Sequence, residues 1–453
     1  MEQPGTPQGT GSGEPTLRRS IGLWQMMLYG AGSMLGAGIY GLLGVVASEM
    51  GSAIWLAFAL SMVAAGLTGL SYASLGSRYP RAGGAAYITH RAYRRTLLTH
   101  VVGLSVACSG FTSIAAGARV VGQNLQALPL FSGLAPGTLA FIYLVFVGVL
   151  VYRGIRESIW ANVVFTLVEA AGLVFVVAVC MRFWGSANLL EFPSAPGTDS
   201  GLPLVFLING IVLTFYSFLG FEDAINVAEE LKNPRRDMPL GLVLALALTV
   251  LLYMGVSVSA VSVMPWQELA QADAPLAAVV ERAAPWVPAG MFIAITIFAV
   301  ANTGLINYVT ASRLLYGMAR DGQLPRALAK VHPERRTPHV AVALIFALIV
   351  LLILSGDISQ LASATVLLLL LVFSAVNAAL VILKLRPGEP EGAFELPIAV
   401  PALGALVCIV MFVARATAGD IRAPVIAAIL IVAVLGLHLV LRPRLAGTDE
   451  SSG

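Results

Sequence analysis

The amino-acid sequence predicts an all-α integral membrane protein with about twelve transmembrane helices. Composition is the first reason: 58% of the 453 residues are hydrophobic and 11% are charged, which is far from the balance of a water-soluble protein. The second reason is that apolar runs recur along almost the whole chain. A helix needs roughly 18 apolar residues to cross about 30 Å of hydrocarbon, and about twelve runs reach or approach that length.

The expected helices form one membrane domain over residues 17–444, built from two repeats of five helices and two further helices. Repeat one covers about 21–184, repeat two about 203–384, and helices 11 and 12 about 398–441. The expected spans are 21–47, 52–77, 97–124, 137–153, 158–184, 203–231, 240–263, 288–317, 338–355, 358–384, 398–415 and 423–441.

The distribution of Lys and Arg orients these helices, because cytoplasmic loops carry an excess of both. With the N-terminus in the cytoplasm, 22 of the 27 Lys and Arg residues fall inside. The exceptions are Arg182, Arg282, Arg415 and Arg422 outside and Arg119 within a helix. We therefore expect cytoplasmic tails at both ends, over residues 1–16 and 445–453. The first tail is rich in Gly, Pro, Thr and Gln and is expected to be disordered.

Several function classes lack the residues that they would need. Cytoplasmic Lys and Arg account for the net charge of +3, so no basic cluster points to nucleic acid. Cys108, Cys180 and Cys408 occur singly, without metal-ligand spacing, and are expected to serve in packing. The five histidines are scattered, and no H-E-x-x-H motif or nucleophile with a base suggests an enzyme. We expect no enzymatic activity, metal or cofactor.

The first span contains GAGSMLGAGIYGLLG (30–44), which is rich in a residue that weakens helices. Gly36, Ala37 and Gly38 can leave helical geometry at little steric cost. In a bilayer, the exposed backbone groups are tolerated only where they line a cavity or contact a ligand. Close helix packing through small residues, such as Gly32 and Gly36, is the alternative explanation.

The sixth span shows a second interruption, from Ser217 to Gly220. Beyond it, Glu222 and Asp223 would lie in the first turn of a new half-helix, where the positive end of the helix dipole favours carboxylates. The alternative is that the two acids merely cap that half-helix. The first and sixth helices occupy corresponding positions of the two repeats, and such pairs of broken helices are typical of the central binding site of a transporter.

Four stretches resemble motifs of the amino acid/polyamine/organocation (APC) superfamily of permeases. GAGSMLGAGIYGLLG is similar to the glycine motif of their first helix, and FYSFLGFEDAINVAEELKNPRRDMP (215–239) to the signature of their sixth. RYPRAGGAAY (78–87) resembles the loop after their second helix, and ASRLLYGMARDGQLP (311–325) the end of their eighth. The motifs stand in the order of the family and span most of the chain, whereas the last two helices rest on hydropathy alone.

The resemblance implies a leucine-transporter-type architecture, in which two inverted repeats surround a substrate site between helices 1, 3, 6, 8 and 10. It implies that the N–H groups of Ala37 and Gly38 bind a substrate carboxylate. The carbonyls of Met34, Tyr216 and Leu219 would bind the α-amino group. Helix N-termini attract anions and exposed carbonyls attract cations, so a zwitterion suits such a site. Ala37 stands where relatives often have Ser or Thr, which leaves the carboxylate to the amides alone.

The predicted substrate-binding residues are Met34, Gly36, Ala37, Gly38, Ile39, Tyr216, Phe218, Leu219, Gly220 and Asn302. Tyr216 is also a candidate gate, because its ring could cover a bound substrate; a core aromatic is an equal alternative. Glu169, Glu222 and Thr303 are the predicted ion-coupling residues.

Glu169 lies near the middle of the fifth span, where an ionisable residue suggests a function. By resemblance, its position matches one at which proton-coupled relatives place a lysine that occupies the space of a sodium ion. Glu169 differs in charge but can also take up and release a proton as helices 1 and 8 move past helix 5. Sodium coordination is one alternative, and a protonated carboxyl simply hydrogen-bonded to helix 1 carbonyls is another.

We expect a secondary active transporter of the plasma membrane that takes up neutral L-amino acids by alternating access, coupled to protons. Glu222 or Asp223 turned inward would instead favour a transporter or exchanger for arginine, lysine or a polyamine. Sodium symport, a channel and a nutrient receptor also stay open. The expected partners are the amino acid and the lipid bilayer. A disulfide-linked heavy chain is not indicated, because residues 124–137 contain no cysteine; the sequence is silent on homo-oligomers.

Overall fold

The structure is a computed structural model that describes residues 21–80, 84–153, 159–193, 204–320, 323–335, 337–417 and 421–441. The described part is helical, with β-structure limited to one isolated bridge. The predicted tails over 1–16 and 445–453 lie outside the described residues.

The first half of the chain contains α1 (Leu23–Met34), α2 (Ala37–Gly41), α3 (Leu43–Met50), η1 (Gly51–Ala53), α4 (Ile54–Arg78), α5 (Gly84–Tyr93), α6 (Thr96–Gln126), α7 (Pro136–Arg153), α8 (Ile159–Cys180) and η2 (Met181–Phe183). The second half contains α9 (Leu204–Phe218), η3 (Phe221–Glu230), α10 (Pro234–Val263), α11 (Trp266–Gln271), α12 (Pro275–Ala283), α13 (Ala289–Arg320), η4 (Arg326–Ala329), α14 (His339–Ser355), α15 (Ile358–Leu385), α16 (Ala399–Thr417) and α17 (Arg422–Leu441). Elements labelled η are 3₁₀ helices.

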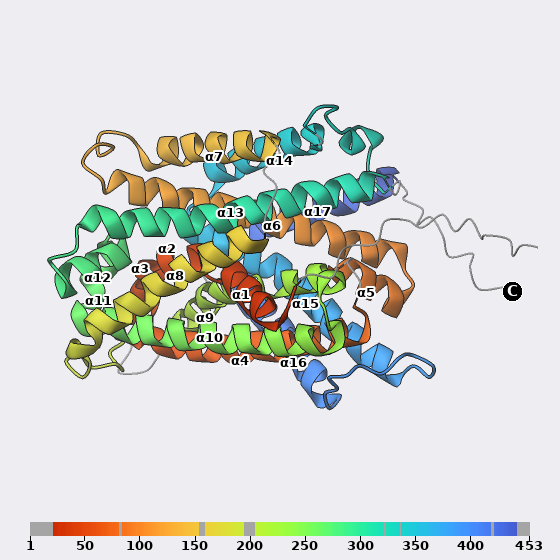
Figure 1. The fold of residues 1–453 in the computed structure, drawn as a ribbon, viewed down its shortest axis with the longest axis horizontal. Helices are drawn as coiled ribbons and strands as arrows, with labels where there is room; N and C mark the ends of the chain where they lie inside the picture. The colour runs from red at the N-terminus through yellow and green to blue at the C-terminus, as the bar shows by residue number, and fades with distance from the viewer. Residues whose placement is uncertain are drawn as a thin grey trace, which may run out of the picture.

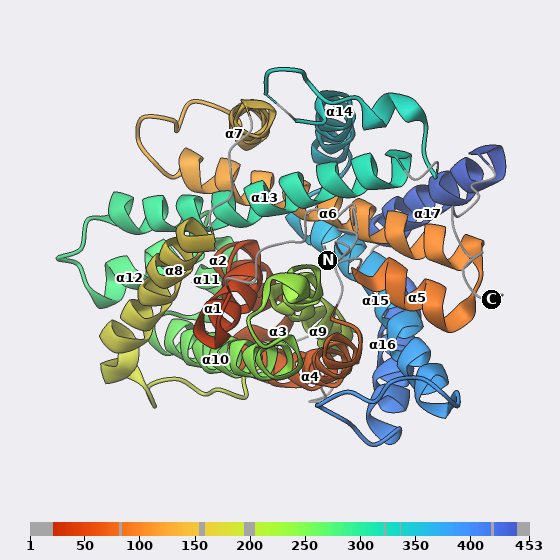
Figure 2. The same ribbon diagram turned by 45° about the vertical axis from the view of Figure 1, so that its right-hand side comes forward.

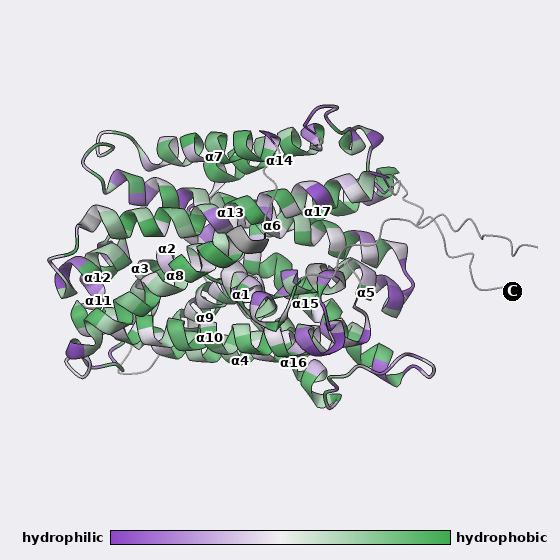
Figure 3. Cartoon of the chain, in the orientation of Figure 1, coloured by the Kyte–Doolittle hydropathy of each residue, from purple (hydrophilic) through white to green (hydrophobic). Residues whose placement is uncertain are grey.

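Twelve membrane crossings account for the long helices. Ten stretches in the described part of the chain are long and apolar enough to cross a bilayer, with Leu43–Arg78 counted as one. The apolar 17-residue α14 and the first span, formed by α1, α2 and α3, bring the number to twelve. Long helices such as α10 and α13 run lengthwise through the molecule (Figure 1), and hydrophilic residues gather near helix ends and in loops (Figure 3). The predicted all-α membrane fold is confirmed.

Three short helices were not predicted: α5, α11 and α12. They have 10, 6 and 9 residues, so each is too short to contain the long apolar run on which the sequence prediction relied. α5 follows α4 at the end of the molecule where α15 also ends, and α11 and α12 connect α10 to α13.

The first span lies in the interior of the bundle. α1 contacts α8, α10 and η3, and the last turn of α1, from Gly30 to Met34, is buried. Figure 2 shows α1 among these helices. Just before α1, the N–H of Ile21 donates to the carbonyl of Glu230 at 3.0 Å, and the N–H of Lys232 donates to the carbonyl of Ile21 at 2.9 Å. This pair forms the isolated bridge and joins the start of α1 to the end of η3.

A charged cluster lies where α4, α5 and α15 end. Glu395, in the segment between α15 and α16, accepts two hydrogen bonds of 2.7 Å from Arg78 and one from Lys384. Glu389 accepts hydrogen bonds of 2.8 Å from Arg91 and from the Tyr79 hydroxyl. The loop between α15 and α16 is therefore fixed to the ends of α4 and α5 by charge-assisted hydrogen bonds, which are stronger than neutral ones.

Candidate functional site

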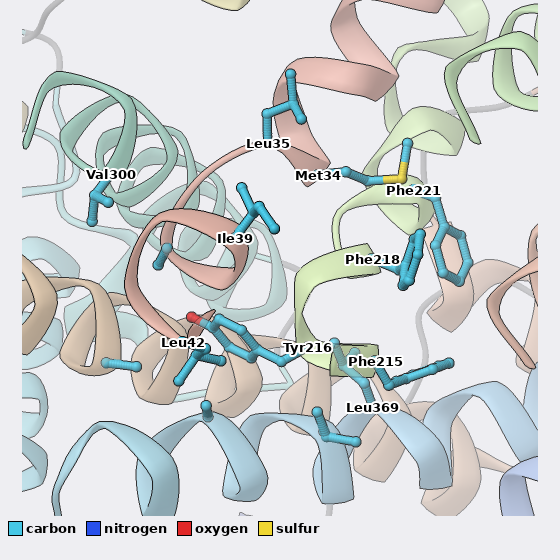
Figure 4. Packing of buried hydrophobic residues seen from close by; sticks show 14 of the residues in the cluster. Met34, Leu35, Ile39, Leu42, Phe215, Tyr216, Phe218, Phe221, Val300 and Leu369 are labelled. Carbon is cyan, nitrogen blue, oxygen red and sulfur yellow. The ribbon is translucent and has the colours of Figure 1, made fainter. Parts of the chain in front are cut away.

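The first and sixth spans both lose helical geometry in the interior of the bundle, as predicted. α1 ends at Met34, Leu35 is extended with ψ 128°, and α2 begins at Ala37. In the sixth span, α9 ends at Phe218 and a 3₁₀ helix, η3, begins at Phe221. The second half of this span is thus more tightly wound than an α-helix. Figure 4 shows the open segment of the first span beside the end of α9.

Two glycines allow these breaks to approach each other closely. A Cβ atom added at Gly38 would lie 2.6 Å from the Cβ of Ser217 in α9. One added at Gly220 would lie 2.5 Å from the carbonyl carbon of Ser33 in α1. Gly220 also has φ +119°, in the left-handed region that favours glycine. At both positions the absent side chain permits contact between the two broken spans.

Close helix packing, the alternative explanation for the glycine motif, also operates. A Cβ at Gly32 would clash with the side chain of Thr166 in α8, and one at Gly36 would lie 2.5 Å from the Thr303 hydroxyl in α13. That hydroxyl donates to the carbonyl of Leu35 at 3.0 Å and so satisfies one backbone group that the break exposes. The motif therefore combines close packing against α8 and α13 with unwinding.

Tyr253 of α10 connects the two breaks. Its hydroxyl lies 2.7 Å from the carbonyl oxygen of Met34 and 2.8 Å from that of Ser217, so it can donate to either. The side chain is fully buried, with its ring beside those of Phe58 and Phe218. A carbonyl has two lone pairs, so the Met34 oxygen could still accept a hydrogen bond from an ammonium group. Sequence reasoning missed Tyr253, because one Tyr in a long apolar helix looks like a packing residue.

The two breaks line a cavity together with α6, α13 and α15. Its lining residues are Ser33, Met34, Gly36, Ala37, Gly38, Val106, Ala107, Ser109, Gly110, Ser113, Tyr216, Leu219, Gly220, Glu222, Asp223, Thr303, Asn307, Thr310, Ala311, Leu314, Thr365 and Leu369. The cavity therefore lies between helices 1, 3, 6, 8 and 10.

Most residues of the predicted site line this cavity: Met34, Gly36, Ala37, Gly38, Tyr216, Leu219, Gly220, Glu222 and Thr303. Four others lie elsewhere. Ile39 is fully buried, and Phe218 is 1% exposed, packed against Phe58 and Tyr253. Asn302 is hydrogen-bonded to Glu169 behind the cavity wall. Neighbours in a helix point to different faces, so a motif read as a continuous string includes residues that face away from the site.

Polar residues of α6 and α13 were missed by the sequence prediction. The hydroxyls of Ser113 and Tyr216 are 3.1 Å apart, and the Asn307 amide donates to Ser113 at 3.3 Å. This network holds the Tyr216 ring across the gap between α9 and α6. A signal was present: Ser109 and Ser113 are four residues apart, as are Thr303 and Asn307, which places each pair on one helix face.

The two acids of η3 also reach the cavity. Glu222 and Asp223 stand in the first turn of η3, as predicted, and both line the cavity wall. The Glu222 carboxylate accepts a hydrogen bond of 2.8 Å from the N–H of Gly220, so it caps the break. Capping and exposure to the cavity thus occur together.

Glu169 lies at the junction of α8 with the first span and α13. Its side chain is fully buried; one carboxyl oxygen accepts a hydrogen bond of 3.1 Å from Asn302, and the other has no hydrogen-bond partner among the described residues. The Tyr40 hydroxyl donates to the Glu169 backbone carbonyl at 2.8 Å. The carboxyl is therefore bonded to α13 rather than to first-span carbonyls, and none of the ion pairs among the described residues includes it.

Twelve membrane-spanning helices, with two broken helices meeting at an internal cavity, are the arrangement of a secondary transporter. The family model described as Amino acid permease matches residues 21–435. The chain belongs to this family, within the APC superfamily, and is therefore a multi-pass membrane transporter rather than an enzyme. In the described part of the chain, no three His, Cys, Asp or Glu side chains are grouped so as to hold a metal ion.

Relatives carry several transport names. The branched-chain amino acid permease BcaP of Bacillus subtilis is 28% identical over 88% of this chain and 88% of its own length. Cationic amino acid transporter 4 of Mus musculus is 28% identical over 85% of this chain and 63% of its own length. The methylthioribose transporter of Bacillus subtilis is 27% identical over 87% and 88%. The family thus includes relatives named for apolar, cationic and non-amino-acid substrates.

Proposed function

We propose that this permease is a secondary active carrier that takes up neutral L-amino acids across the plasma membrane by alternating access. The observation that carries this proposal is the meeting of the two broken spans at one cavity. The N–H groups of Ala37 and Gly38 belong to the first turn of α2, where helix N–H groups lack acceptors within the helix, and they would bind the substrate carboxylate. The carbonyls of Met34, Tyr216 and Leu219 would bind the ammonium group.

The remaining cavity wall supports a neutral side chain. Val106, Ala107, Leu314 and Leu369 provide apolar surface, while the hydroxyl and amide groups are largely bonded to one another. The test is competition by unlabelled amino acids against labelled L-leucine bound to the purified protein. Neutral amino acids should compete. Competition by arginine, lysine and polyamines alone would contradict the proposal.

A cationic substrate is the second candidate, and the position of Glu222 and Asp223 supports it. Both acids line the cavity, and no Lys or Arg is among its lining residues. A cationic side chain or a polyamine could pair with Asp223, whereas Glu222 is already engaged by Gly220. The same competition experiment, repeated with Asp223→Asn, tests this candidate: the affinity for arginine should fall while that for leucine is retained.

For energy coupling we propose a proton carried by Glu169. A buried charge without a counter-charge is costly, and binding a proton or a cation relieves that cost. Glu169 lies between α8 and the parts of the first span and α13 that would move during alternating access, and it contacts the latter through Asn302. Its carboxyl has a single hydrogen-bond partner in the described residues, Asn302, whereas sodium requires several oxygen ligands. Sodium is the alternative coupling ion.

The coupling test is uptake into proteoliposomes under an imposed pH gradient, with and without sodium. The native protein should follow the pH gradient without sodium, and Glu169→Gln should not. Glu281→Gln, at an exposed acid of α12, is the matched control. A native protein that ignores the gradient, or a Glu169→Gln variant that follows it, would remove Glu169 from this role.

The plasma-membrane location with cytoplasmic termini is part of the same proposal. It is supported by the excess of Lys and Arg on one side. A cysteine introduced at Lys330 should be labelled by an impermeant reagent only after cell lysis, and one at Glu281 in intact cells. The three native cysteines are buried and should contribute little background.

A further inference from the structure

A second cavity lies on the outer face of the bundle, between α4 and α10. It is a crevice of about 420 Å³ whose walls include Ala65 and Gly66 of α4 and Leu246, Ala247 and Leu251 of α10. Its floor is the ring of Phe218, at the end of α9. A Cβ atom at Gly66 would have no heavy atom within 4 Å, so the space beside this glycine is empty of protein atoms.

The position of the crevice identifies the medium that fills it. Gly66 and Ala247 lie near the middle of their helices, and α4 and α10 are both membrane spans. The rim is exposed, with Leu251 at 71%, and this exposed face of a membrane span contacts lipid. All the lining side chains are apolar, so neither water nor a zwitterionic substrate would find a polar partner there. The chemistry that matches the site is a hydrocarbon chain.

We propose that the crevice binds an acyl chain of a membrane phospholipid, with the end of the chain against Phe218. Attraction between lipid and protein side chains is not hydrophobic in origin, since both are apolar. The stabilisation comes from dispersion contacts, which an empty crevice would forfeit on every side. The small side chains of Gly66, Ala65 and Ala247 provide the space for the chain.

The bound chain supports the junction of the two broken spans. The Phe218 ring lies 5.2 Å from the ring of Tyr253, centroid to centroid, and Tyr253 bonds the carbonyls of Met34 and Ser217. An acyl chain behind Phe218 therefore holds the aromatic pair in place from the lipid side. This role does not depend on which substrate or ion the permease carries.

Photocrosslinking tests the proposal on the full-length protein. The protein is reconstituted in vesicles of phosphatidylcholine that carries a diazirine near the end of one acyl chain, then irradiated, digested and mapped by mass spectrometry. We expect adducts on the peptide that contains Phe218, whose side chain is only 1% exposed and can be reached only by a chain inside the crevice. A diazirine near the headgroup should give no adduct on this peptide.

Filling the crevice should abolish the signal. Gly66→Leu places a side chain in the empty space, and Ala247→Leu does so from the opposite wall, in case the first variant does not fold. Gly436→Leu is the matched control, because Gly436 is an exposed helical glycine whose Cβ would also meet no atom within 4 Å. Loss of the Phe218 adduct in folded Gly66→Leu or Ala247→Leu, with retention in Gly436→Leu, supports the site. Absence of the adduct in the native protein, or its persistence in both filled variants, overturns it.

Discussion

Gly38→Ala is the smallest change that tests the proposed carboxylate site. The added methyl group would lie 2.6 Å from the Cβ of Ser217, whereas ordinary contact begins at 3.4 Å, so α2 or α9 must move by about 0.8 Å. Such a movement would displace the N–H groups of Ala37 and Gly38 from the carboxylate. A hydrogen bond to a charged group contributes about 1.5–3 kcal/mol. Loss of one amide contact should therefore raise the substrate Kd about 10- to 150-fold.

The assay is equilibrium binding of labelled L-leucine and L-arginine, one for each candidate substrate class, to purified protein. Gly38→Val, with a bulkier branched side chain, should abolish binding while the other helices remain folded. Gly436→Ala is the control and should bind with native affinity, since its Cβ meets no atom within 4 Å. Native affinity in well-folded Gly38→Ala and Gly38→Val would refute the reasoning, because the backbone amides could then not be the anchor.

Two further predictions concern stability. Tyr253→Phe removes the hydroxyl shared by Met34 and Ser217 but keeps the ring, and should cost about 1–3 kcal/mol in thermal unfolding; Tyr143→Phe, which removes a buried hydroxyl without a partner among the described residues, should cost less, and equal losses would contradict the assignment. Burial raises the pKa of Glu395, but hydrogen bonds from Arg78 and Lys384 outweigh it and lower that pKa from 4.5 to about 2. A depressed folded-state pKa stabilises above the unfolded value, so Glu395→Gln should lower the unfolding midpoint at pH 7. The difference should shrink as the pH falls from about 4.5 to about 2, and a pH-independent difference would contradict it.

The sequence was most informative where one physical constraint dominated. Length and hydropathy located the membrane spans, because crossing hydrocarbon requires long apolar helices. Glycines located both breaks, since the approach of Gly38 to Ser217 and of Gly220 to Ser33 leaves no room for a side chain. The short amphipathic α5, α11 and α12 escaped prediction because they bury only one face and need no long apolar run.

The cavity wall was harder to predict, because it depends on how helices far apart in the sequence are rotated against one another. Ser113 and Asn307 are 194 residues apart yet share a hydrogen bond, and nothing local in either helix specifies the other. The glutamic acid in α8 could be recognised as unusual from its depth alone, whereas its partner Asn302 required the packing of α8 against α13.

The backbone pairing of Ile21 with Glu230 and Lys232 has a mechanical consequence. It fastens the entry to α1 to the exit from η3, while Tyr253 fastens the opposite ends of the same two segments. Two rods tied at both ends behave as one lever, so a tilt of α1 that widened the cavity would carry η3 with it. A single pair of distance probes, placed on α1 and on α6, would then report the swing of both broken helices.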